Sequence, residues 1–187
     1  EIVISRAKHS VKYPAKFMLL GAMNPCPCGF LGDKEKQCTC SDFQINRYLS
    51  KLSGPLLDRI DIQVDVPRLT PTELLATTEI EEDSATIRKR VIAARKIQAI
   101  RYKNDNILTN SELTSELIKK YCQLDSKSQE LMKIAIVKYQ LSGRRYDRVL
   151  KLARTIADLA NSENIQQIHL MQALQYKMFN IENYTNK

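Results

Sequence analysis

The sequence is poor in features that mark several common classes of protein. Its 187 residues contain no tryptophan and only 6% aromatic residues, so an aromatic platform for stacking single-stranded bases is not evident. It has no run of about 18 apolar residues that could span a membrane, and no charged-then-apolar leader that would indicate secretion. None of its five glycines begins a G-x-x-x-x-G-K-S/T loop, and no apolar run ends in an Asp-Glu pair. These residues therefore offer no P-loop of their own for cradling phosphates.

Positive charge is what the chain has in excess. Lysine and arginine number 29 against 21 acidic residues, which gives a formal net charge of +8. Such a balance suits nucleic-acid or nucleotide partners, because cations neutralise phosphates. Many basic proteins bind neither, so charge alone does not decide. The length fits one large domain or two small ones with a sizeable core.

Four of the five cysteines form two Cys-x-Cys pairs with nine residues between them, namely Cys26, Cys28, Cys38 and Cys40. In a reducing cytosol this pattern favours a metal over disulfides. Paired thiols on turns supply the tetrahedral ligands that Zn²⁺ prefers, and four of them leave no open position for catalysis. The alternatives are four reduced thiols in a loop, or two disulfides. Cys122 stands alone, and we expect it to be buried as a small apolar side chain.

The first 68 residues are expected to be rich in strands and loops. The predicted elements are a hairpin from 1–5 and 11–13, strands at 16–23 and 60–66, and a helix within 41–52. The segment 16–23 is nearly all apolar, which suits a strand buried on both faces. The segment 60–66 alternates apolar with acidic or polar residues, which suits a half-buried strand.

Helical patterns follow from residue 69 onward. A linker leads to a long basic helix from Ser84 to about Lys103. Capping-box spacing at Thr109/Glu112 and Ser126/Gln129 predicts two further helix starts. Apolar stripes predict two more helices, over 147–160 and 167–179. Residues from about 110 onward therefore predict a small helical bundle.

Three polar residues are candidates for a ligand site. Asn24 ends the apolar run at 16–23, where it could hold a water or a phosphate oxygen, or could simply cap the turn before Pro25. Arg59 and Arg144 could each donate a bidentate fork to a γ-phosphate, or form ordinary salt bridges. The other arginines to weigh are Arg145, Arg148 and Arg154. The two histidines, His9 and His169, are expected at the surface.

Several strings in the chain together resemble one known family. They are Ala22-Met23-Asn24-Pro25-Cys26-Pro27-Cys28-Gly29, Cys38-Thr39-Cys40, Ser53-Gly54-Pro55-Leu56-Leu57-Asp58-Arg59-Ile60-Asp61, Leu141-Ser142-Gly143-Arg144 and Ala153-Arg154-Thr155-Ile156-Ala157-Asp158-Leu159. The family is ComM/YifB, bacterial AAA+ ATPases related to the ATPase subunit of magnesium chelatase. The resemblance runs over essentially the whole chain.

This resemblance implies a fold and a division of the chain. Residues 1–68 would be an α/β remnant, the C-terminal strands of an AAA+ P-loop core with the Cys-rich loop. Residues 69–109 would be a linker and long helix, and residues 110–187 an all-α helical lid, so that the fragment is mostly helical. The family's Walker A and Walker B motifs would lie before Glu1. The fragment is then not expected to hydrolyse ATP alone.

The resemblance also implies roles for individual residues. Asn24 matches sensor 1, which polarises the attacking water, and Arg59 matches the arginine finger supplied to a neighbouring subunit's ATP. Arg144 matches sensor 2, with Arg145 as the alternative in register. The implied cofactors of the intact protein are ATP and Mg²⁺, with structural Zn²⁺ at the four paired cysteines.

The implied partners are other copies of the chain and DNA. The family implies a ring, most simply a hexamer, in the cytoplasm and with no membrane partner. One branch is associated with DNA branch migration during natural transformation, whereas magnesium chelatase drives metal insertion into a porphyrin. The cysteine cluster and the charge of +8 favour the DNA branch. The alternatives are a chelatase-type ATPase acting on a protein partner, and a zinc-stabilised binding module without an ATP role.

Overall fold

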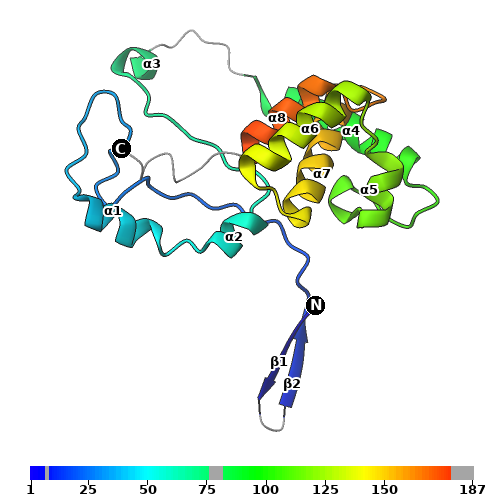
Figure 1. The fold of residues 1–187 in the computed structure, drawn as a ribbon, viewed down its shortest axis with the longest axis horizontal. Helices are drawn as coiled ribbons and strands as arrows, with labels where there is room; N and C mark the ends of the chain where they lie inside the picture. Colours follow the sequence, from blue (N-terminus) through cyan, green and yellow to red (C-terminus); the bar gives the residue numbers. More distant parts are fainter. Residues whose placement is uncertain (7–8, 76–81, 178–187) are drawn as a thin grey trace.

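The computed structural model describes residues 1–6, 9–75 and 82–177, and it is mostly helical (Figure 1). Its sheet is one antiparallel hairpin of β1 (Ile2–Arg6) and β2 (His9–Tyr13), in which Ile2 lies opposite Tyr13. The hairpin projects away from the rest of the chain, and the side chains of both strands are exposed. The predicted hairpin is confirmed, apart from turn residues 7 and 8, which lie outside the described residues.

Three short helices interrupt the extended chain between the hairpin and the bundle. They are α1 (Asp42–Leu49), α2 (Gly54–Arg59) and α3 (Pro71–Leu75). A full capping box begins α1, because Ser41 accepts from the Gln44 backbone and the Gln44 side chain accepts from the Ser41 backbone. Ser53 caps α2 with a single hydrogen bond that its side chain accepts from the Leu56 backbone N–H, and Pro55 lies in the first turn.

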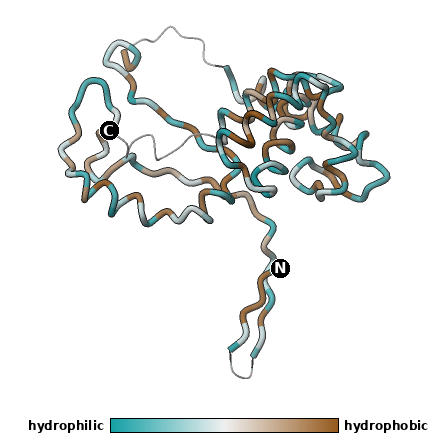
Figure 2. Tube along the Cα trace, viewed as in Figure 1, coloured by the Kyte–Doolittle hydropathy of each residue, from teal (hydrophilic) through white to brown (hydrophobic). Residues whose placement is uncertain are grey.

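The strands predicted at 16–23 and 60–66 are wrong as assignments, because neither segment forms a strand and the sheet within the described residues consists of β1 and β2. A strand needs a neighbour to accept and donate its backbone hydrogen bonds. Their apolar side chains stay in solvent, with Leu20 93% and Val66 84% exposed. Hydrophobic stretches consequently run along the chain outside the bundle (Figure 2).

The remaining elements form a helical bundle centred on α7. In chain order they are α4 (Ser84–Arg101), the 3₁₀ turn η1 (Asn110–Glu112), α5 (Ser115–Tyr121), α6 (Ser126–Tyr139), α7 (Gly143–Leu159) and α8 (Gln167–Lys177). Helix α7 packs against α4, η1, α5 and α8, and α8 also packs against α6. The predicted bundle is confirmed over residues 110–177.

Three predicted helix starts differ from the helix caps in the structure. Thr109 precedes only η1, and α5 begins later with Thr114 as its cap. Asp125 caps α6 in place of Ser126, because a carboxylate one residue earlier reaches the Ser128 backbone N–H at 2.8 Å. Helix α7 begins at Gly143 rather than Asp147, capped by Ser142. The shift matters because it places Arg144 and Arg145 in the first turn of α7.

A buried polar network ties α4 and η1 to α7 through Asp158, which is 2% exposed. Its carboxylate accepts from Arg101 Nη2 at 2.5 Å and from Arg154 Nε at 3.1 Å. Gln98 and Asn110 donate to the same carboxylate at 3.2 and 2.9 Å. A buried carboxylate that accepts hydrogen bonds from four side chains holds α4, η1 and α7 in fixed relative positions.

Among the described helices, none combines the length and apolar character that crossing a membrane requires.

Candidate metal centre and nucleotide-site arginines

The four paired cysteines come together in space. The Sγ atoms of Cys26 and Cys28 are 3.4 Å apart, and Cys38 Sγ lies 3.7 and 3.6 Å from these two. All four Sγ atoms, including that of Cys40, lie within 4.8 Å of one another as free thiols. A tetrahedron of sulfurs around Zn²⁺ at about 2.3 Å has edges of about 3.8 Å. The four cysteines could therefore hold a metal ion of that kind.

Local turns and one short helix build this cluster. The Gly29 backbone N–H donates to the Cys26 carbonyl at 3.0 Å, and Gly29 has a φ of 83°, which closes the turn between the first two thiols. The second pair runs directly into the cap of α1. Cys26 is fully buried against Ile45 and Leu49 of that helix. These three side chains are the fully or almost fully buried members of the small apolar core around the cysteine cluster.

The thiols influence one another electrostatically. Backbone hydrogen bonds from Phe30 and Thr39 lower the pKa of the Cys28 thiol to about 5. At Cys38 a backbone hydrogen bond from Cys40 lowers the pKa, but desolvation and the neighbouring thiols outweigh it and raise the pKa to about 12. Desolvation also raises the pKa of Cys40. Four thiolates cannot gather without a cation, and a bound divalent metal deprotonates coordinating thiols outright.

Arg59 stands at the end of α2, with its guanidinium exposed and Nη1 donating to the Pro55 carbonyl at 3.2 Å. The backbone beside it is held by α7. Arg145 Nε donates to Asp58 Oδ1 at 2.6 Å, and Arg148 donates to the Arg59 carbonyl at 2.6 Å and to the Asp61 carboxylate. We call the contacts of Arg145 and Arg148 with residues 58–61 the arginine clamp. The clamp fixes the backbone of Arg59 and leaves its side chain in solvent.

Arg144 is exposed in the first turn of α7, and within the described residues no ion pair or hydrogen bond involves its side chain. It lines an open cavity of about 660 Å³ together with Thr114, Arg148 and Lys151. Burial and then the charge of Arg148 lower the pKa of Lys151. The cavity wall carries the cations Arg144, Arg148 and Lys151 and the carboxylate of Asp147, so its net charge is positive near the first turns of the 17-residue helix α7 and attracts anions.

Asn24 is exposed immediately before the cysteine turn, where its side chain approaches Gly29. Among the described residues, no hydrogen bond joins Asn24 to Arg59 or Arg144. The structure thus brings the Arg59 segment and the Arg144 helix together but leaves Asn24 with the cysteine loop.

Sequence reasoning missed the acidic half of the clamp. Asp58 and Asp61 flank Arg59 in the string that carries the resemblance, and their charge pattern complements the basic start of α7. The surface position expected for His169 is wrong, because it is 6% exposed and its Nδ1 accepts from the Gln166 backbone N–H at 3.1 Å. The expected burial of Cys122 is confirmed.

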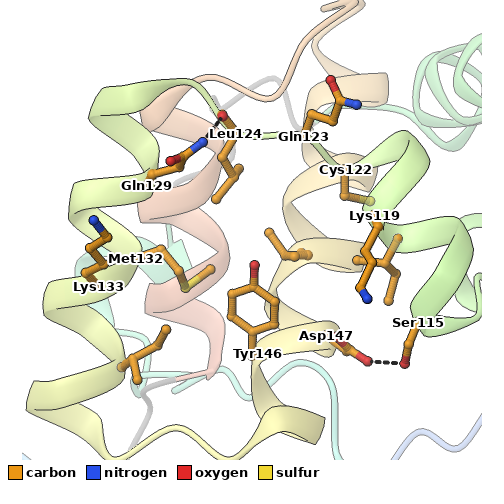
Figure 3. A pocket seen from close by; sticks show the side chains of 13 residues that line it. Ser115, Lys119, Cys122, Gln123, Leu124, Gln129, Met132, Lys133, Tyr146 and Asp147 are labelled. Atoms are coloured by element: carbon orange, nitrogen blue, oxygen red, sulfur yellow. Dashed lines mark hydrogen bonds between the residues drawn. The ribbon is translucent and has the colours of Figure 1, made fainter.

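A second cavity of about 430 Å³ lies between α5, α6 and α7 (Figure 3). Its wall is mainly apolar, with the buried Met132 and Cys122 on it. Burial raises the pKa of the Cys122 thiol to about 11, which makes it a poor nucleophile. At the rim, Ser115 donates to Asp147 at 2.7 Å. This cavity holds none of the residues predicted to bind a ligand.

The first part of the chain thus contains a thiol cluster that could hold a metal, and the helical bundle contacts the end of α2 through Arg145 and Arg148. Comparison with known families agrees over both regions. Residues 1–74 match the family model described as magnesium chelatase, subunit ChlI, and residues 81–177 match magnesium chelatase, subunit ChlI C-terminal. The chain belongs to the magnesium chelatase ChlI family.

Relatives within this family include the competence protein ComM of Haemophilus influenzae, which is 41% identical over 177 residues, and YifB of Escherichia coli, which is 40% identical over the same length. Each alignment covers 95% of this chain and 34% of the relative. A Mycobacterium tuberculosis relative is 36% identical over 160 residues, or 86% of this chain and 31% of its own. The resemblance to ComM/YifB is confirmed, and the chain spans about a third of the length of these relatives. The domain boundaries at 68 and 109 stay predictions.

Proposed function

We propose that this chain forms part of a magnesium chelatase-like AAA+ ATPase that assembles as a ring, most simply a hexamer, and remodels branched DNA. In this proposal Arg59 is the arginine finger for a neighbouring subunit's ATP, Arg144 is sensor 2 and Asn24 is sensor 1. ATP and Mg²⁺ are the cofactors of the intact protein. The cytoplasm is its proposed location, since a reducing compartment keeps the four thiols available for metal.

The observation that carries this proposal is the arginine clamp. It holds the Arg59 backbone against α7 while the Arg59 guanidinium stays exposed. A finger must reach a phosphate outside its own subunit, so an anchored backbone with an exposed side chain suits the role. The clamp also favours Arg144 over Arg145 as sensor 2, because the Arg145 guanidinium already binds Asp58.

The four cysteines have a structural role in this proposal. Their Sγ separations approach those of a tetrahedral zinc site, and a site with four thiolates has no open position for a substrate. We therefore assign Zn²⁺ to folding of the loop rather than to catalysis. Asn24 precedes this loop by two residues, so the metal would also fix the place from which sensor 1 acts.

The first experiment measures ATP binding and turnover of the intact protein carrying Arg59→Ala. We expect turnover to fall by about 10³ to 10⁵, with ATP binding retained, because an arginine finger stabilises charge in the transition state. Arg47→Ala, an exposed arginine on α1, is the matched control and should leave turnover unchanged. Unchanged turnover in Arg59→Ala would remove the finger assignment.

A mixing experiment tests whether the finger acts in trans. Arg59→Ala and Arg144→Ala subunits should each be inactive alone. In mixed rings, some interfaces combine an intact Arg144 with an intact Arg59 from the neighbour, so part of the turnover should return. No recovery on mixing would argue against action between subunits.

The choice of DNA as substrate is tested by turnover with and without forked DNA. The net charge of +8 and the likeness to ComM support DNA. Strong stimulation is the expected result. Turnover indifferent to forked DNA would shift the proposal to a chelatase-type ATPase that acts on a protein partner.

A further inference from the structure

Helix α4 carries a concentrated positive charge, of which the bundle binds Arg101 through Asp158. It contains six lysines and arginines, Arg88, Lys89, Arg90, Arg95, Lys96 and Arg101, and no acidic residue. Residues 84–93 are all exposed, and the first buried side chain of the helix is Ala94. Only the later part of α4 therefore packs against the bundle, where Gln98 and Arg101 join the Asp158 network.

The six cations divide between two sides of the helix. Arg101 binds Asp158, and Arg90 makes a bidentate pair with Glu82 at 2.9 Å through both nitrogens. The other four lie at 88, 89, 95 and 96, and a spacing of seven residues returns to the same side of an α-helix after two turns. Among the described residues, no ion pair or hydrogen bond is made by these four side chains. They form what we call the α4 basic face.

We propose that the α4 basic face binds the phosphate backbone of duplex DNA. Its two pairs of cations are separated by about 10 Å along the helix, and a duplex carries one negative charge per about 1.7 Å of its axis. Both pairs of cations can therefore contact phosphates of the same duplex at the same time. Binding of this kind positions DNA without reading its sequence. This inference rests on the proposed function, since it names where the DNA substrate is held.

A membrane surface fits this helix less well. A helix that lies on a bilayer inserts an apolar face opposite its charged face. In α4 the side opposite the basic face is occupied in its later part, because Ala94 and Gln98 are buried against the bundle, which leaves Ile87 and Val91, each 42% exposed, as the apolar surface on that side. DNA needs only the exposed basic face itself.

The test compares two variants with equal change in charge in the intact protein. One carries Arg88→Gln, Lys89→Gln, Arg95→Gln and Lys96→Gln. The other carries Lys119→Gln, Lys127→Gln, Lys133→Gln and Lys138→Gln, which are exposed lysines on α5 and α6. Glutamine has a helix propensity close to that of lysine and arginine, so both variants should keep their helices, as circular dichroism will show. Affinity for a labelled duplex of mixed sequence is measured between roughly 50 and 200 mM salt.

We expect the α4 variant to bind the duplex at least about tenfold more weakly and with a salt slope smaller by about 3 to 4, since each lost phosphate contact removes about 0.9 from the slope. The α5/α6 variant should bind as the wild type does, and turnover without DNA should be unchanged in both.

Equal weakening in the two variants would overturn the proposal, because net charge alone would then explain binding. Wild-type affinity in the α4 variant would also overturn it, while leaving DNA-stimulated turnover and the proposed function intact. A variant that loses binding to phosphatidylserine vesicles but not to the duplex would assign α4 to membranes instead. A wild-type protein that neither binds DNA nor responds to it would remove both proposals.

Discussion

In the bundle of residues 82–177, one apolar cluster extends from Tyr102 to Leu174, and Val149 and Leu170 at its centre are fully buried. In residues 9–75, the described core is Cys26, Ile45 and Leu49. Phe17 and Leu20, which lie between the hairpin and the cysteine loop, are 74% and 93% exposed. The same chain thus contains one region that packs on itself and another that does not.

The difference shows what each region needs in order to be stable. A helix makes its backbone hydrogen bonds within the element and requires only one apolar face to be covered by neighbours. An extended segment needs a partner strand, and clustered thiols need a cation. We therefore expect the fold of the bundle to be stabilised by its own side chains. The fold of the cysteine region should instead depend on groups that it binds.

Metal removal should have the largest effect and should separate the two regions most clearly. In Cys26→Ser we expect bound zinc to fall from one ion per chain to none. Backbone amides of residues 26–49 should lose their protection from hydrogen exchange, while those of α7 keep theirs. Structural zinc in small peptides contributes roughly 10–16 kcal/mol, and each buried apolar side chain only about 1.5–3 kcal/mol.

Cys122→Ser is the matched control for this exchange of sulfur for oxygen. It lies outside the thiol cluster, so the protein should keep its zinc and the protection of residues 26–49. If metal loss from Cys26→Ser also released α7, the two regions would be one cooperative unit and the comparison would fail.

The next largest effect is expected inside the bundle, from Asp158→Ala. This change leaves Arg101 and Arg154 without their carboxylate in a buried site, so the free energy of unfolding should fall by about 3–5 kcal/mol. Urea unfolding followed by circular dichroism measures it. Glu82→Gln breaks the exposed pair with Arg90 and should cost less than about 1 kcal/mol. Similar losses in the two variants would mean that the network contributes no more than a surface pair.

The contrast between the regions also explains which elements could be predicted from the sequence. Helix α7 was predicted because its apolar stripe is a local pattern, and the thiol cluster because paired cysteines on turns are close in the chain. The strands predicted at 16–23 and 60–66 are wrong, because a hydrophobic pattern indicates burial but does not identify a partner strand.

The contacts of the candidate site could not be predicted from the sequence for a similar reason. Arg145 and Asp58 are far apart in the chain, so nothing local in the sequence shows that they pair. His169 was placed at the surface because a single histidine in a helical pattern carries no sign of burial. The roles of Asn24, Arg59 and Arg144 stay predictions, supported by the family and by the exposure of the two arginines.

The arginine clamp joins the two regions, and breaking it should have a smaller effect on stability. Arg148 and Asp61 form a partly exposed pair, so their double-mutant cycle with Arg148→Gln and Asp61→Asn should give a coupling energy of about 0.2–1 kcal/mol. Hydrogen exchange at residues 58–63 should rise in Arg148→Gln. Arg144→Gln, one turn earlier in α7, should leave that exchange unchanged. A coupling energy of zero would mean that the Arg148–Asp61 pair does not contribute to holding the Arg59 segment.

The smallest effect is expected from protonation of His169 in the bundle. Burial and the charge of Arg154 lower the pKa of His169 below its usual value of about 6.5. The unfolded chain then binds a proton more readily than the folded one, so this contribution to stability is complete above about pH 6.5 and is lost as the pH falls below it. A protonated ring also cannot accept the hydrogen bond from Gln166 at Nδ1. In His169→Gln the free energy of unfolding should be lower overall but should decline less between neutral and mildly acidic pH. An unchanged decline in that variant would show that other groups carry the pH dependence and that His169 does not couple the bundle to protons.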